Sequence, residues 1–114
     1  MNKDKIKQMF IDSSMQRIES INKNFEEIKR KNQVEVDDLI LDTYILAHSI
    51  NSSSVFLPIL KISQSCKLIE NDIKKWLEDG YVLSEQKIEE TEAAIDKLRI
   101  MINNIEDYLG ESNR

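Results

Sequence analysis

Apolar residues recur along the chain at intervals of three and four positions, which is the spacing of one face of an α-helix. The pattern falls into four segments and predicts helices over about 3–31, 36–56, 58–80 and 84–109. The positions expected to be buried are Ile6, Phe10, Ser14, Ile18, Ile21, Phe25 and Ile28; Val36, Ile40, Thr43, Ala47, Ile50 and Ser54; Ile59, Ile62, Cys66, Ile69, Ile73 and Trp76; and Ile88, Thr91, Ile95, Leu98, Ile102, Ile105 and Leu109.

Residues with special backbone preferences mark the predicted helix ends. Pro58 suits the first position of a helix but not its interior, so one helix should end near Phe56 and the next should begin there. Gly80 favours a helix stop, and Ser84 is a good N-cap. The four helices are therefore expected to be joined by short connections.

Four amphipathic helices with short connections can bury their apolar stripes by packing as an antiparallel up-down-up-down four-helix bundle. The chain has 114 residues but only two glycines and one proline, which argues against a β-sandwich or barrel. We expect an all-α fold with one domain over residues 1–109 and a frayed tail over residues 110–114.

Charge and hydropathy exclude several classes of function. The formal net charge of -5 lacks the basic character that phosphate backbones require, so nucleic acid is not expected as a partner. The longest apolar run, Val55 to Leu60, is too short to cross a membrane, and the first residues lead into no signal-like apolar stretch. These features predict a cytoplasmic protein that does not bind membranes.

His48 is the one histidine in the chain, and it follows the predicted core residue Ala47. One residue turns a helix by about 100°, so His48 is expected near the surface. A solvated or half-buried histidine without a special role is the ordinary alternative. However, the small residues Ala47, Ser49 and Ser52 surround it. Serine is a mediocre helix former, which suggests that something other than helix stability selected the serines at these positions.

The residues around His48 resemble a known family. Residues 47–54, Ala-His-Ser-Ile-Asn-Ser-Ser-Ser, are followed by Leu57-Pro58, Ile62, Cys66 and Ile69-Glu70. This pattern is similar to that of the histidine phosphotransfer (HPt) domain, whose motif is Ala-His-Thr/Ser-Leu-Lys-Gly-Ser. Within the family the likeness is greatest to the amino-terminal phosphotransfer domain of the chemotaxis histidine kinase CheA.

The resemblance implies that His48 accepts a phosphoryl group and passes it to an aspartate of a receiver domain. Glu70 matches the family residue that accepts a hydrogen bond from Nδ1 of the histidine, although an ordinary surface carboxylate is the alternative. Asn51 stands where the family has lysine, and Ser52 stands where it has glycine. The partners implied are a response-regulator receiver domain and the ATP-binding domain of a histidine kinase.

A phosphotransfer module of this kind is a substrate of its partners rather than an enzyme. The chain has no glycine-rich phosphate loop, so nucleotide and Mg²⁺ would belong to the partner and no cofactor is expected. One histidine and one cysteine provide no tetrahedral ligand set, so no metal site is expected. We expect a monomer.

Docking of a receiver domain needs a surface around the histidine. Tyr44, Ile45, Ser52 and Val55 lie within one or two helical turns of His48 and are candidates for a modest apolar patch. Lys67 and Asn71 on the third helix are candidates for polar contacts at its rim. The alternative is a broad-faced second helix whose apolar residues are covered by its neighbours.

Two other functions stay open. Because Asn51 and Ser52 depart from the family pattern, the chain could be a degenerate HPt-like bundle that binds a kinase or receiver without phosphotransfer. It could also be a structural helical protein that self-associates through Tyr44 and Ile45. A hydrolase is disfavoured, because four plain helices provide neither a strained nucleophile turn nor an oxyanion hole.

Overall fold

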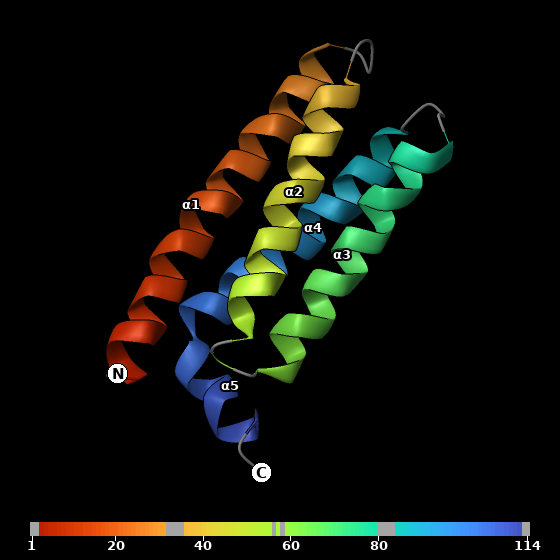
Figure 1. Ribbon diagram of the computed structural model, residues 1–114. Helices are drawn as coiled ribbons and strands as arrows, with labels where there is room; N and C mark the ends of the chain where they lie inside the picture. The colour runs from red at the N-terminus through yellow and green to blue at the C-terminus, as the bar shows by residue number, and fades with distance from the viewer. Residues whose placement is uncertain (1–2, 32–35, 56, 58, 80–83, 113–114) are drawn as a thin grey trace.

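The computed structural model describes residues 3–31, 36–55, 57, 59–79 and 84–112, and within these ranges every regular element is a helix. Four helices are long and one is short (Figure 1). They are α1 (Lys3–Arg30), α2 (Asp37–Ser54), α3 (Leu60–Asp79), α4 (Glu85–Asn103) and α5 (Ile105–Ser112). The all-helical composition agrees with the sequence prediction.

The four long helices lie side by side in an elongated molecule of 45 × 22 × 19 Å (Figure 1). α1 packs on α2 and α4, and α3 packs on the same two helices, while α5 contacts α4 at one end. These contacts are consistent with the predicted bundle. None of the described helices combines the length and apolarity that crossing a membrane requires.

The core contains the apolar stripes that the helical spacing predicts. Every predicted position is buried except Ile6, which is partly buried, and Leu109, whose side chain lies outside the described part of the chain. Isoleucine dominates this core, and its burial removes large apolar surface from water, which stabilises the packed helices. Phe25 and Trp76 pack edge to face, with ring centroids 6.3 Å apart, near the C-terminal ends of α1 and α3.

Polar residues within the stripes are mostly satisfied by the preceding helical turn. The hydroxyls of Thr43 and Thr91 donate to the carbonyls of Leu39 and Lys87 at 2.7 and 3.0 Å. Among the described side chains, the hydroxyl of Ser14 is the buried polar atom that lacks a hydrogen-bond partner. Leaving a buried donor unpaired destabilises the folded state.

α2 ends at Ser54, earlier than the predicted end near Phe56, and α3 begins at Leu60. The Ser54 hydroxyl donates to the Asn51 carbonyl at 2.6 Å, and the Leu57 amide donates to the Ser54 carbonyl at 3.0 Å. These bonds close the chain into a turn. Phe56, Pro58 and Gly80 lie outside the described residues, whereas Ser84 is confirmed as an N-cap, because its hydroxyl accepts from the Lys87 amide at 3.1 Å.

The last predicted helix, over 84–109, is divided in the structure at Asn104, where φ is -112° and ψ is 37°. The Asn104 side chain donates to the Ile100 carbonyl at 2.8 Å, so the asparagine competes with the backbone for a helical acceptor. α5 then runs to Ser112, although the sequence predicts a frayed tail from residue 110. An ion pair between Lys7 and Glu106 ties α5 to α1.

Candidate functional site

His48 lies on the exposed flank of α2. Its neighbour Ala47 is buried against the core, and the turn of one residue leaves 59% of the imidazole side chain exposed to solvent. The placement agrees with the sequence prediction. The ring is open to a molecule approaching from outside.

Glu70 on α3 lies directly behind the ring. Its Oε1 atom is 2.6 Å from Nδ1 of His48, and its side chain is only 11% exposed. Because an ionised carboxylate only accepts hydrogen bonds, this contact places the proton of a neutral imidazole on Nδ1 and leaves the lone pair on Nε2. The structure thus brings together the two residues that the family resemblance pairs, which helical spacing alone does not place on one flank.

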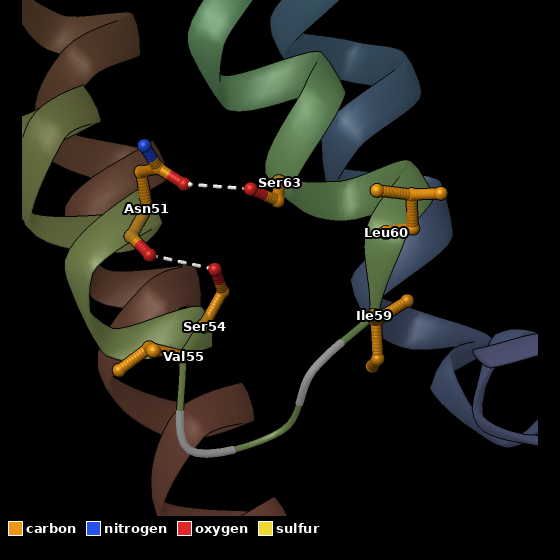
Figure 2. Close-up of a pocket in the computed structure, with 6 residues that line it drawn as sticks. All are labelled: Asn51, Ser54, Val55, Ile59, Leu60 and Ser63. Carbon is orange, nitrogen blue, oxygen red and sulfur yellow. Dashed lines mark hydrogen bonds between the residues drawn. The ribbon is translucent and has the colours of Figure 1, made fainter. Parts of the chain in front are cut away.

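Asn51, one turn after His48, contacts the same carboxylate. Its Nδ2 atom is 3.5 Å from Oε2 of Glu70, and its Oδ1 atom accepts from the hydroxyl of Ser63 on α3 at 3.3 Å (Figure 2). We call His48, Glu70, Asn51 and Ser63 the His48 network. Ser63 is not among the residues predicted from the sequence, although its position seven residues before Glu70 places both on one face of α3.

Tyr44 stacks on His48 from the preceding turn of α2. The two rings are nearly parallel, at 8°, with centroids 6.2 Å apart. Tyr44 is also partly buried and packs against the core, so only part of it is available to a partner. Tyr44 therefore mainly supports one side of the imidazole and contributes little to the predicted apolar patch around His48.

An exposed stripe on α2 surrounds the histidine. Ile45, Ser52 and Val55 are exposed, as the sequence predicts, and Leu41 is a further exposed apolar residue that was not predicted. Their spacing of three and four residues, with His48 in the middle, places them on one face. The exposure of Leu41 could have been predicted, because it lies seven residues, or about two helical turns, before His48.

The two rim candidates on α3 are both exposed. Lys67 precedes Glu70 by three residues and therefore lies on the same side of α3, one turn away. Asn71 follows Glu70 by one residue, which turns it about 100° around the helix. Lys67 is therefore the better placed of the two to reach a group bound at His48.

A cavity of about 340 Å³ lies beside the His48 network, between the end of α2 and the start of α3 (Figure 2). Its lining is mostly apolar, with Asn51 and Ser63 facing each other across it. The remaining lining residues are Ser54, Val55, Ile59 and Leu60. Val55 and Leu60, which lie on opposite sides of the cavity in Figure 2, are both exposed.

Cys66, buried one turn before Glu70, is the other potential nucleophile near the site. Burial, together with the nearby negative charge of Glu70, raises the pKa of its thiol to about 12. A thiol that stays protonated at neutral pH is a poor nucleophile and a poor metal ligand. Of these two side chains, only the imidazole of His48 is exposed to solvent.

The arrangement provides an exposed imidazole with a free lone pair on Nε2 and a carboxylate that can stabilise positive charge on the ring. Within the described part of the chain, no group of three or more histidine, cysteine, aspartate or glutamate side chains is placed to hold a metal ion. No family model, curated protein or solved structure matches this chain.

Proposed function

We propose that the chain is a histidine phosphotransfer module of a two-component or chemotaxis-type signalling system. In this proposal the four long helices form an antiparallel up-down-up-down bundle of the HPt type. The observation that carries the proposal is the exposed His48, held through Nδ1 by the buried Glu70 carboxylate at 2.6 Å. The resemblance of residues 47–54 to the HPt motif supports it independently.

The proposed chemistry is a nucleophilic displacement at phosphorus. The Nε2 lone pair attacks the phosphorus of the donor, which is the γ-phosphate of ATP on a kinase or the acyl phosphate of a receiver aspartate. A nitrogen–phosphorus bond forms while the bond from phosphorus to the leaving oxygen breaks, and that oxygen keeps the electron pair. Transfer from His48 to a receiver aspartate is the same step in reverse.

Glu70 contributes by stabilising the charged ring. Nδ1 keeps its proton throughout, so the imidazole becomes positively charged when Nε2 bonds to phosphorus. The carboxylate at 2.6 Å offsets this charge and fixes the tautomer before attack. The chain supplies the nucleophile, and the partner supplies nucleotide and Mg²⁺.

The exposed stripe on α2 supports the proposed partners. Leu41, Ile45 and Val55 flank His48 with apolar surface, which suits docking of a receiver domain whose aspartate must reach Nε2. We propose that the chain acts as a monomer in the cytoplasm, where kinases and receivers of this type work. A sedimentation mass that rises with concentration would instead support self-association through this stripe.

Phosphorylation by a small phosphoryl donor tests the proposal without a cognate partner. Incubation with phosphoramidate should add the mass of one phosphoryl group, and the label should be labile in acid and stable in base. His48→Gln should abolish it, whereas Ser49→Ala, next to the histidine on α2, should retain it. A wild-type protein that gains no label from phosphoramidate or from several histidine kinases would refute phosphotransfer.

Binding without phosphotransfer is a second candidate, favoured by the absence of a cation at position 51. The Asn51 side chain contacts Glu70, but its amide is uncharged. Position 51 therefore provides no positive charge that would attract a phosphoryl group. The double variant Asn51→Lys/Ser52→Gly restores the HPt pattern. Label that appears only in this variant would identify the natural chain as a binding protein.

A further inference from the structure

We propose that Asn51 and Ser63 are positioning residues that hold the Glu70 carboxylate in place behind His48. The inference rests on the proposed function, which it deepens by naming residues that set the reactivity of the histidine. The geometry is a chain of polar contacts from Ser63 on α3 to Asn51 on α2, back to Glu70 on α3, and on to His48.

The two oxygens of Glu70 have different partners. Oε1 faces Nδ1 of His48 at 2.6 Å, and Oε2 faces Nδ2 of Asn51 at 3.5 Å. Because the Glu70 side chain is almost completely buried, an oxygen without a donor would be poorly solvated. Asn51 therefore stabilises the carboxylate rotamer in which the other oxygen faces the imidazole.

Ser63 determines which end of the Asn51 amide faces the carboxylate. An ionised carboxylate only accepts hydrogen bonds, so the amide must present Nδ2 and not Oδ1 to it. The Ser63 hydroxyl, 3.3 Å from Oδ1, donates to the opposite end of the amide (Figure 2). A flipped amide would place two oxygens together at Glu70, and the serine opposes that arrangement.

Asn51 is also anchored through its backbone. Its carbonyl accepts from the Ser54 hydroxyl at 2.6 Å, within the final turn of α2. Asn51 and Ser63 line the cavity of about 340 Å³, so alanine at either position enlarges an existing space and opens no new void in the core. The truncated variants are therefore expected to fold.

The test measures two properties of His48, the ratio of its two tautomers and its rate of phosphorylation. Ring-nitrogen chemical shifts in ¹⁵N NMR give the ratio of the Nδ1–H to the Nε2–H tautomer, which a merely structural role would not change. Asn51→Ala and Ser63→Ala should each lower this ratio about threefold, the effect of one weak hydrogen bond. The initial rate of labelling by phosphoramidate should fall as well, because a displaced carboxylate stabilises the positively charged ring less.

Three further variants separate positioning from general damage. Ser63→Thr keeps the hydroxyl and should restore both values. Ser65→Ala makes the same change two residues along α3, outside the network, and should match the wild type. Adding Ser63→Ala to Asn51→Ala should have no further effect, because Ser63 acts through Asn51.

Wild-type tautomer ratios and normal labelling in both alanine variants would overturn the positioning role and leave the proposed function intact. A shifted tautomer in the variants, with no labelling of any form of the protein, would support the positioning role and refute the proposed function. Additive effects in the double variant would also count against the inference, because they would show that Ser63 acts independently.

Discussion

Replacing Glu70 with glutamine removes the negative charge behind His48 while keeping the length and volume of the side chain. The amide oxygen can still accept a hydrogen bond from Nδ1, so the ring should stay in place. What is lost is the stabilisation of positive charge on the imidazole as Nε2 bonds to phosphorus. Phosphorylation of His48 should therefore slow, with little change in fold.

The size of the effect follows from the geometry of the pair. Nδ1 and Oε1 are 2.6 Å apart, but the imidazole side chain is 59% exposed, so solvent screens part of the interaction. A hydrogen bond to a charged group contributes about 1 kcal/mol more than one between neutral groups. That difference corresponds to about a fivefold decrease in rate.

The assay is the initial rate of labelling by phosphoramidate, followed by mass spectrometry. Glu78→Gln is the matched control, since it makes the same change on a carboxylate of α3 that pairs with Lys74. Circular dichroism should give the same helical signal for both variants. An unchanged rate for Glu70→Gln, with the fold intact, would show that the carboxylate does not act on the histidine.

Three further predictions concern stability and thiol reactivity. Ile50→Ala, in the core, should lower the free energy of unfolding in urea by about 3 kcal/mol. Ile45→Ala, at an exposed site on the same helix, should change it by less than about 0.5 kcal/mol. Similar losses in the two variants would contradict the burial of Ile50 and the exposure of Ile45. Ser14→Ala should raise the melting temperature, because it removes an unpaired buried hydroxyl and improves helix propensity, and a lower value would indicate a hidden partner. Burial raises the pKa of Cys66 from 9.0 to about 12, so the unfolded chain loses the thiol proton at lower pH than the folded chain does. The free energy of unfolding should therefore decline as pH rises above 9.0, and the Cys66→Ala variant should lack this decline. A thiol-specific reagent should label Cys66 only after denaturation.

The helical core could be predicted from the sequence because burial in a helix follows a simple period. Ile18, Ile21, Phe25 and Ile28 repeat at intervals of three and four, and all four are buried. Helix ends depend on weaker, local hydrogen bonds. The Asn104 side chain interrupts the last helix without any break in the apolar spacing, so periodicity could not show it.

The site was less accessible to prediction from sequence than the core. The helical spacing predicted the exposure of His48, because exposure depends only on where the residue lies around the axis of its own helix. The contact with Glu70 depends on how α2 and α3 align along their axes, which a single-helix pattern does not contain, and the family resemblance supplied it. The links from Asn51 to Glu70 and Ser63 depend on rotamers and on hydrogen-bond donors, so only side-chain coordinates show them.

The edge-to-face pair of Phe25 and Trp76 gives this protein a built-in optical reporter. Trp76 is the one tryptophan of the chain, and it follows Glu70 by six residues, or about 9 Å along α3. Its fluorescence should change sharply when the helices separate and little when His48 gains a substituent. A single emission spectrum can thus distinguish a variant that has unfolded from one that has only lost its chemistry.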